Sequence, residues 1–345
     1  MSESGSVSLW ERAGDEGVVR LRFGILGTAR IARTFFLPGA RASRHATTLA
    51  IASRDPSRAE TVATEFNIPR VHASYEALLA DPDIDAVYIP LPNRLHEEWT
   101  IAAARAGKHV LCEKPVAGHV AAAQRMADAC RAAGVVLMEA FMWRHHPQHR
   151  RVRELLTSGI IGDPNFVRAS FTFVIGEQVE HHTNVRLQQD LEGGSLMDIG
   201  CYGVNAARWV FESEPKVALG QQSVDPEHGV DMAFAGVLRF SAHRLAVFDS
   251  SFVSAPRNTY TVEGPLGTLH VERAFRPDDD PATIVVTRPD QPVLVEQIPA
   301  AHQFALEIDH FAESVAAGRL LAPAEDGVAQ ARVIEALYAS ARNTP

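Results

Sequence analysis

The sequence has little cysteine: three residues in 345, with no two of them in a C-x-x-C pair. This scarcity argues against a disulfide framework or a cysteine zinc site and is typical of a reducing compartment. The chain also lacks an apolar run near the roughly 20 residues that span a bilayer. Its first stretch, MSESGSVSLWERAGDEGVVR, carries acids in place of an apolar signal segment. We therefore expect a cytoplasmic protein with no membrane partner, and residues 1–19 as a flexible arm.

Blocks of like charge, internal repeats and low-complexity tracts are also missing. The net charge of −9, with both signs interspersed, argues against a surface that follows the phosphates of nucleic acid. Hydrophobic residues make up 46% of the chain, which is enough for one large or two ordinary hydrophobic cores. A small molecule is therefore the expected partner, and nucleic acid is not.

The pattern of apolar residues changes along the chain. Short runs rich in Val, Ile and Leu, such as LRFGIL, IDAVYIPLP and HVLCE, first alternate with Ala-rich helical stretches. Such runs are typical of strands buried on both faces of a parallel sheet. From Asn165 onwards, strand-like runs such as FVRASFTFV and RLAVFDSSFV follow one another with few helices between them. This second pattern predicts a mostly antiparallel sheet.

The predicted fold class is therefore α/β, with two domains. A doubly wound parallel sheet of the Rossmann type is expected over residues 20–143. An α/β domain with a large, mostly antiparallel open sheet is expected over residues 144–345. Helices are expected in this second part near Asp198 and twice near the C-terminus, in FALEIDHFAESVAAG and VAQARVIEALYASA. We expect the last helix to pack on the first domain.

The turn after the first predicted strand is a candidate nucleotide-binding loop. It reads GTARIA, where a dinucleotide fingerprint has G-x-G-x-x-G/A. Because the middle glycine is replaced by alanine, the motif alone fits an ordinary strand–turn–helix equally well. A tight turn before a helix N-terminus can still offer backbone N–H groups to a pyrophosphate. The candidate cofactor contacts are Gly27, Thr28, Ala29, Arg30 and Ile31.

The end of the second predicted strand bears on cofactor choice. Ser53 stands where NAD-binding folds place an acid for the ribose 2′-hydroxyl, and Arg54 and Arg58 follow it. Guanidinium groups at this position suit a 2′-phosphate. We therefore predict NADP(H) as the preferred cofactor, with NAD(H) as the alternative. The two arginines could instead be solvated at a helix start, with Asp55 paired to either of them.

Two later strand ends fall on the carboxyl edge of the sheet, where open α/β sheets bind ligands. The first carries the candidate cofactor contacts Leu91, Pro92, Asn93 and His96. The second, in VLCEKPVAG, carries Glu113 and Lys114, which we place at the cofactor cleft. The amine of Lys114 can orient a substrate hydroxyl and help to move its proton. The alternative is a surface lysine paired with Glu113.

Two residues follow the next predicted strand, VVLMEAF. We predict that Trp143 and Arg144 lie near the nicotinamide end of the cofactor. A core tryptophan at the domain junction is the alternative for Trp143.

Three motifs, in order along the chain, resemble those of the Gfo/Idh/MocA oxidoreductases: PN-x-x-H, GKHVLCEKP and GGSLMDIGCY. The resemblance covers nearly the whole chain from about Leu21. It implies a Rossmann domain that binds NAD(P), and a C-terminal domain whose open sheet often forms a dimer interface, so a homodimer or homotetramer through that sheet is expected. It also implies that Lys114 is the family's substrate-facing lysine, followed by a cis proline. Asp198 and Tyr202 match the family's acid and its proton-transfer residue.

The motif has tyrosine rather than histidine at position 202. In this it resembles the motif of the family branch that contains glucose–fructose oxidoreductase, D-xylose dehydrogenases and dihydrodiol dehydrogenases. A free tyrosine has a pKa of about 10, so a nearby cation has to ease its ionisation. Lys114 can supply that charge. Asp198 and Tyr202 are four residues apart and share a face if the segment is helical. The alternative is that Asp198 only caps the helix.

Polar residues before the GGSLMD segment are candidate contacts to substrate hydroxyls. They are His181, Asn184 and Arg186. Outside this stretch, Lys114, Asp198 and Tyr202 are further candidate contacts to the substrate. For the first three, a solvated loop is an equally compatible interpretation. The histidines of HHPQH do not predict a metal site, because Pro147 breaks the helical presentation of His145 and His149. We predict no metal.

Together with these residues, the resemblance implies an NADP-dependent sugar dehydrogenase. Hydride would pass between C1 of an aldose, such as D-xylose or D-glucose, and the nicotinamide. Tyr202 takes the hydroxyl proton, Lys114 orients the oxygen, and Asp198 holds the substrate or the tyrosine. Three alternatives stay open: an NADPH-dependent ketoreductase on a keto- or anhydro-sugar, including nucleotide-linked ones, a trans-dihydrodiol dehydrogenase, and a non-catalytic NADP-binding sensor.

Overall fold

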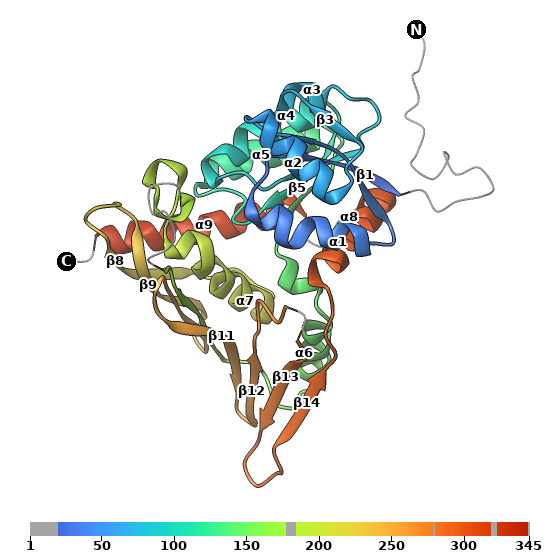
Figure 1. Ribbon diagram of the computed structural model, residues 1–345. Coiled ribbons are helices and arrows are strands. Elements are labelled where there is room, and N and C mark those ends of the chain that lie inside the picture. Colours follow the sequence, from blue (N-terminus) through green and yellow to red (C-terminus); the bar gives the residue numbers. More distant parts are fainter. Residues whose placement is uncertain (1–19, 177–183, 279, 319–322, 344–345) are drawn as a thin grey trace.

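The computed structural model describes residues 20–176, 184–278, 280–318 and 323–343. The predicted arm, residues 1–19, and the candidate His181 lie outside the described residues. The described chain forms a six-stranded sheet and an eight-stranded sheet, which lie one above the other in Figure 1. The predicted α/β fold class, with a parallel Rossmann-type sheet and a second, mostly antiparallel sheet, is confirmed.

The first sheet has the strand order β3-β2-β1-β4-β5-β6, and every neighbouring pair is parallel. Its strands are β1 (Leu21–Leu26), β2 (Ala46–Ala52), β3 (Arg70–His72), β4 (Ala86–Ile89), β5 (His109–Glu113) and β6 (Leu137–Ala140). The order reverses between β1 and β4, and a crevice at such a switch point is where doubly wound sheets bind ligands. The carboxyl ends of β1, β4 and β5 therefore define the expected site.

Helices cover both faces of this sheet. They are α1 (Leu37–Ala42), α2 (Pro56–Phe66), α3 (Tyr75–Leu79), α4 (His96–Arg105) and α5 (Val120–Ala133), with a π-helical turn η1 (Ala32–Phe36) before α1 and a 3₁₀ turn η2 (Asn93–Leu95) before α4. All four residues of β4 are buried, as expected for a strand covered on both faces.

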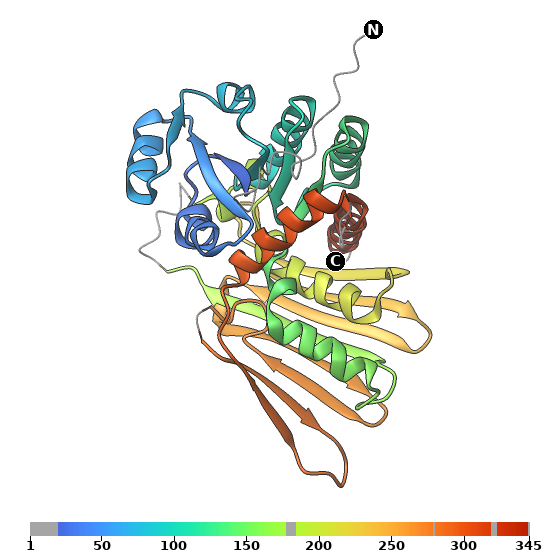
Figure 2. The same ribbon diagram turned by 90° about the vertical axis from the view of Figure 1, so that its right-hand side faces the viewer.

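A helix from the predicted second domain also belongs to the core of the first sheet. Helix α8 (Gln303–Ala317) packs beside α1, and the two helices lie together in both views (Figures 1 and 2). Ile308 and Phe311 of α8 are fully buried in the same cluster as Phe23 of β1. Residues 144–345 are therefore not confined to the second sheet, because the apolar face of α8 needs this partner surface.

The second sheet has the order β14-β13-β12-β11-β7-β10-β9-β8. Its strands are β7 (Phe166–Val174), β8 (Val217–Val224), β9 (Asp231–Ser241), β10 (Arg244–Ser251), β11 (Val253–Gly264), β12 (Gly267–Glu272), β13 (Ala282–Thr287) and β14 (Leu294–Ile298). All of its pairs are antiparallel except β10 with β7, which is parallel.

One face of the second sheet is covered by helices. These are α6 (Pro147–Thr157), α7 (Cys201–Phe211) and α9 (Ala324–Arg342); Figure 2 shows α7 on the side of the sheet toward the first domain and α6 lying along the sheet farther from that domain. Short turns precede α6 and α7: η3 (Met142–His145), η5 (Val185–Leu187), η6 (Gln189–Leu191) and the π-helical η7 (Leu196–Gly200). Helix α9 packs on β8 of this sheet and on α5 of the first domain. None of the described helices is both long and apolar enough to cross a membrane.

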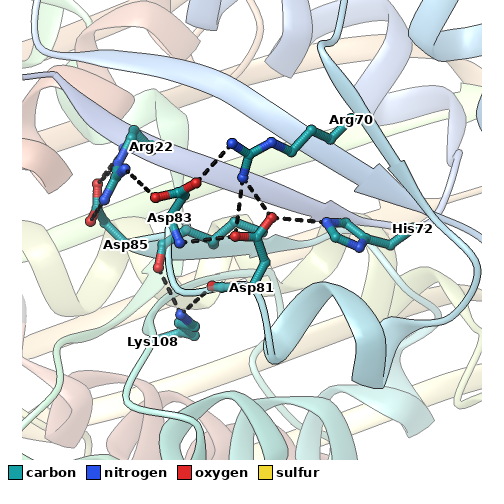
Figure 3. Close-up of polar contacts among 8 residues, drawn as sticks. Arg22, Arg70, His72, Asp81, Asp83, Asp85 and Lys108 are labelled. Carbon is teal, nitrogen blue, oxygen red and sulfur yellow. Dashed lines mark hydrogen bonds and ion pairs between the residues drawn. The ribbon is translucent and has the colours of Figure 1, made fainter.

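A polar network ties the loop before β4 to the amino edge of the first sheet (Figure 3). The buried Lys108 Nζ donates to the carbonyl oxygens of Asp81 and Ile84 at 2.7 and 2.8 Å. Arg22 holds the Asp85 carboxylate with Nε and NH2, both at 2.9 Å. The network lies at the edge opposite the carboxyl ends of β1, β4 and β5, so it supports the sheet and not the expected site.

Candidate active site

The lysine at the end of β5 meets the helical segment from the second domain. Lys114 Nζ donates to the Asp198 carbonyl at 2.8 Å and lies 3.4 Å from Asp198 Oδ1. The peptide bond between Lys114 and Pro115 is cis. Glu113 does not pair with this amine: its Oε2 accepts from the Lys114 backbone N–H at 3.2 Å. The alternative of a surface lysine paired with Glu113 is therefore wrong.

Asp198 is shared between two cations. Its Oδ1 faces Lys114, and its Oδ2 accepts from Arg186 Nε at 2.6 Å. Burial acts to raise the pKa of Asp198, but Arg186 and Lys114 outweigh it and lower the pKa to about 2. Asp198 is therefore a carboxylate at neutral pH. It lies inside the π-helical turn η7, and its side chain makes no cap hydrogen bond, so the alternative of a simple helix cap is wrong.

Tyr202 lies on the first turn of α7, beside the same lysine. Lys114 Nζ is 5.2 Å from the centroid of its ring. The ring is 3% exposed and packs against Phe141, Phe171 and Phe275. Burial raises the pKa of Tyr202 above its usual value, although the Lys114 cation acts against it. The phenol is therefore neutral in this structure.

Lys114 keeps its charge in this environment. Burial acts to lower its pKa, but Tyr202 when ionised and the Asp198 carboxylate outweigh burial and raise the pKa of Lys114 above its usual value. The site therefore presents an ammonium group, a carboxylate and a neutral phenol within one side-chain cluster. Such a cluster can orient a hydroxyl oxygen and exchange a proton with it.

The predicted nucleotide loop follows β1 directly. Gly27 has φ +104°, a conformation that side chains with a Cβ rarely adopt, and its N–H donates to the Ala52 carbonyl at 2.7 Å. Thr28, Ala29 and Ile31 are half-buried and Arg30 is exposed. A β-carbon at Gly27 would approach Leu91 Cδ2 to 3.1 Å, so the turn brings the ends of β1 and β4 close together.

The two arginines after β2 are exposed, and neither makes a salt bridge to any described residue. Asp55 Oδ1 caps α2 by accepting from the Ser57 and Arg58 N–H groups. The Ser57 hydroxyl and, after it, the Arg58 charge help to lower the pKa of Asp55, although the Asp55 and Arg58 side chains form no ion pair. Ser53 is buried at the strand end, where its Oγ accepts from the Asp55 N–H at 3.3 Å. The guanidinium groups of Arg54 and Arg58 are therefore available to an anionic ligand.

Three predicted cofactor contacts hold loops together. His96 is fully buried, with Nε2 at 2.8 Å from the Leu91 carbonyl and Nδ1 at 3.1 Å from the Pro115 carbonyl. Asn93 Nδ2 donates to the Glu192 carbonyl at 2.8 Å. The buried Glu113 accepts from the Tyr88 hydroxyl at 2.5 Å. These contacts fix the ends of β4 and β5; the neighbouring Leu91 and Pro92 are half-buried.

Two other predicted cofactor contacts have partners in the second half of the chain. Trp143 is fully buried in the second domain, with ring contacts to His149, Trp209 and Phe275. Arg144 forms an ion pair with Asp326 at 2.7 Å. Trp143 therefore occupies a core position, as the stated alternative expected, because η3 turns the chain into the second domain after β6.

Of the predicted substrate contacts before η7, the structure describes two. Asn184 Oδ1 accepts from the Arg186 N–H at 3.2 Å, and the Arg186 side chain is 44% exposed beside Asp198. The histidines of HHPQH have structural partners: His149 Nε2 lies 2.8 Å from the Ala274 carbonyl, and His146 Nδ1 caps α6. No group of three potential ligands suited to a metal ion occurs among the described residues.

Sequence reasoning missed one residue that touches this cluster and one that holds the neighbouring Glu113. Met142 Sδ accepts from the Tyr202 hydroxyl at 3.4 Å, and Tyr88 orients Glu113. Met142 stands directly before the predicted pair Trp143 and Arg144, so its position just after β6 was the available signal. Tyr88 lies inside a fully apolar run, where its hydroxyl gave no separate signal.

Two family models match the chain. Residues 21–141 match one described as an oxidoreductase family with an NAD-binding Rossmann fold, and residues 149–270 match one described as a GFO/IDH/MocA C-terminal domain. The matches span the first sheet and most of the second.

Individual proteins are also similar. The chain is 40% identical to D-xylose 1-dehydrogenase (NADP(+)) 2 of Haloferax volcanii, over 93% of the chain and 97% of that protein. A crystal structure of a 3-ketoreductase from Actinomadura kijaniata with NADP and TDP-benzene gives a TM-score of 0.87 at 34% identity, covering 93% of the chain and 98% of its own. Aldose–aldose oxidoreductase from Caulobacter crescentus, complexed with glycerol, gives 0.85 at 32% identity, covering 94% and 98%.

Proposed function

The chain belongs to the GFO/IDH/MocA family of oxidoreductases with an NAD-binding Rossmann fold, and from this premise we propose that it is an NADP-dependent sugar dehydrogenase. Its substrate is an aldose such as D-xylose or D-glucose, oxidised at C1. The observation that carries the proposal is the cluster of Lys114, Asp198 and Tyr202 at the carboxyl edge of the first sheet. The 40% identity to a D-xylose 1-dehydrogenase supports the choice of substrate.

The residues present fit NADP. The tight turn at Gly27 leads into a helical segment, so backbone N–H groups are available to a pyrophosphate. Ser53 brings no acid to the end of β2, and Arg54 and Arg58 are exposed there without salt bridges to described residues. A 2′-phosphate would meet two guanidinium groups and no opposing carboxylate at Ser53.

In this mechanism Lys114 donates a hydrogen bond to the hydroxyl oxygen at C1 and holds it toward Tyr202. Tyr202 takes the hydroxyl proton as a phenolate, after its own proton has been released to solvent, and the ammonium group near its ring stabilises that phenolate. Asp198 keeps the lysine in place through its carbonyl and carboxylate. When bound, the nicotinamide supplies the hydride acceptor.

A second candidate is the reverse reaction, reduction of a keto-sugar that carries a nucleotide. The TM-score of 0.87 to a 3-ketoreductase solved with TDP-benzene supports it. So does the partly exposed Arg186 beside Asp198, since a guanidinium group suits a diphosphate.

Absorbance at 340 nm separates the two candidates. NADP+ and NAD+ are run against aldoses and cyclic diols, and NADPH against keto-sugars, with the purified protein. The proposal expects a rise with NADP+ and an aldose. Consumption of NADPH by the keto-sugars alone supports the ketoreductase. If absorbance at 340 nm changes in neither panel although NADP binds, a sensor is favoured.

We predict that Arg54→Ala weakens NADP binding at least about tenfold while NAD binding changes less than about twofold, because the lost guanidinium group would hold only the 2′-phosphate, which NAD lacks. The measurement is a fluorescence titration with each cofactor. Arg105→Ala is the matched control, because Arg105 is an exposed arginine at the end of α4. Equal losses for the two cofactors would remove Arg54 from recognition of the 2′-phosphate.

We further propose a homodimer or homotetramer through the open face of the second sheet. No described helix covers this face (Figure 2). A row of directly paired residues runs across all eight strands: Leu219, Val237, Val247, Arg168, Thr261, His270, Val285 and Val295. The first three and the last two residues of this row are apolar. Leu219, Val237 and Val295 are 54%, 41% and 55% exposed. Exposed apolar residues at both ends of the row, with polar residues between them, suit a self-complementary interface.

The oligomer is tested by Val237→Glu, which places a charge in the middle of the apolar part of this row. We expect a monomer by size-exclusion chromatography with light scattering, where the unchanged protein is a dimer or tetramer. The control, Val71→Glu, adds the same charge at an exposed position on β3 of the first sheet. An oligomer that survives Val237→Glu and dissociates with Val71→Glu would place the interface on the first domain.

A cytoplasmic location and a domain division near residue 143 remain part of the proposal. The three cysteines are free and buried, which suits a reducing compartment. Near residue 143 the chain leaves β6 and enters the core of the second domain at Trp143.

A further inference from the structure

The turn that carries Asp198 is unusual in its own backbone. Residues Leu196–Gly200 are π-helical and lead directly into α7. Single π-helical turns are rare and occur often at functional sites. Lys114 Nζ donates to the backbone carbonyl of Asp198 at 2.8 Å, a shorter contact than the 3.4 Å to its carboxylate. The backbone position of this turn therefore sets where the lysine lies.

A buried carboxylate from the second sheet holds the start of the turn. Asp231 of β9 is 3% exposed, and its Oδ2 accepts from the Leu196 N–H at 2.7 Å and from Ser195 Oγ at 2.8 Å. Its Oδ1 accepts from the Tyr338 hydroxyl of α9 at 2.8 Å. A β-carbon at Gly194 would collide with this carboxylate, so the close approach requires glycine there. Both oxygens of Asp231 are thus committed to the turn and to α9.

A buried amide from α9 holds the end of the turn. Gln330 is fully buried, and its Nε2 donates to the Cys201 carbonyl at 2.8 Å, one residue before Tyr202. Its Oε1 accepts from Arg208 NH1 at 3.0 Å. Helix α9 therefore reaches both ends of the turn, directly through Gln330 and through Tyr338 and Asp231. The same helix contacts the first domain, where Glu335 Oε2 accepts from the Val120 N–H at 3.0 Å.

From this geometry we propose that Asp231 and Gln330 are positioning residues that clamp the π-helical turn and so place Asp198 and Tyr202 against Lys114. Neither residue touches the lysine itself. This inference rests on the proposed function for its kinetic consequence, whereas the clamping of the turn stands on the contacts alone. Misplacement of a catalytic group by about 1 Å can cost about 10²-fold in rate.

The test compares Asp231→Ala and Gln330→Met with Asp231→Asn in the full chain. We expect the first two to raise hydrogen exchange of the amides in residues 196–202 at least about tenfold and to lower kcat by about 10- to 100-fold. The dissociation constant of NADP should change less than about twofold. Asp231→Asn should restore most of both properties, because its amide oxygen can still accept from the Leu196 N–H. The matched control is Gln303→Met, a buried glutamine on α8.

If Asp231→Ala does not fold, Tyr338→Phe replaces it in the test, because this variant removes one hydrogen bond to Asp231 and keeps the aromatic ring. We expect it to raise hydrogen exchange of residues 196–202 by a smaller factor. Unchanged exchange of residues 196–202 in all the variants would overturn the inference. So would a fall in kcat matched by equal losses in NADP affinity and in the Gln303→Met control, which would indicate general destabilisation. The hydrogen-exchange measurement needs no turnover. It therefore tests whether Asp231 and Gln330 hold the turn even if the protein oxidises no sugar.

Discussion

Lys114→Met is expected to lower kcat for sugar oxidation by roughly 10²- to 10⁴-fold while NADP affinity changes less than about twofold. Methionine keeps most of the length of the side chain and removes the ammonium group. The Asp198 carbonyl then loses the donor at 2.8 Å, and the ring of Tyr202 loses the cation 5.2 Å from its centroid. Orientation of the substrate oxygen and stabilisation of the phenolate are lost together.

The same variant is expected to shift the pH dependence of oxidation. Tyr202 has to be ionised to accept the proton; burial raises its pKa and the Lys114 cation lowers it. Activity of the unchanged protein therefore rises with pH toward the pKa of Tyr202. Without the cation that pKa is higher still, so the rise moves to higher pH. Steady-state kinetics from pH 6 to about 10 measures both effects.

The control for this experiment is Lys216→Met, because Lys216 is an exposed lysine just before β8. It removes the same charge at a distance from the cluster, and its kcat should match that of the unchanged protein. Near-normal turnover by Lys114→Met, with an unshifted pH profile, would remove Lys114 from the mechanism.

Tyr202→Phe should have an effect of similar size, a loss of about 10²- to 10⁴-fold in kcat with little change in thermal stability. The ring supplies the packing against Phe141, Phe171 and Phe275, and phenylalanine keeps it. The hydroxyl itself contacts only a thioether among the described residues, Met142 Sδ at 3.4 Å. Its removal therefore costs the protein a proton acceptor and very little structure.

Tyr260→Phe is the matched control, because Tyr260 is fully buried in the same core and its hydroxyl lies 2.9 Å from His149 Nδ1. Kinetics and the melting temperature are measured for both variants. We expect Tyr260→Phe to lose stability and to keep kcat. The reverse pattern, with Tyr202→Phe destabilised and fully active, would assign Tyr202 to the core alone.

Much of the architecture could be predicted from the sequence. The runs LRFGIL, IDAVYIPLP and HVLCE are local signals, because a strand buried on both faces has to be apolar throughout. The strands they predict, β1, β4 and β5, meet at the edge where the motif residues gather. The proximity of Lys114 and Asp198, 84 residues apart, was predicted from the resemblance to a family and not from any local pattern.

The packing arrangements that were not predicted depend on contacts between distant segments. Helix α8 carries an apolar face, but its sequence does not say which sheet that face will meet. Trp143 directly follows the first domain in the chain, yet η3 turns it into the core of the second. Asp231 begins a strand, where an aspartate is usually interpreted as part of a turn. Only the folded chain brings its carboxylate to the amino end of η7.

The most direct test of the central claim follows the hydrogen at C1 of the sugar. The protein is incubated with NADP+ and D-xylose or D-glucose deuterated at C1. The reduced cofactor is then isolated, and its mass is measured by mass spectrometry. The proposed function predicts NADPH that carries one deuterium, and predicts almost none with Tyr202→Phe. NADPH formed without deuterium, or no NADPH from any C1-deuterated aldose, would contradict oxidation at C1.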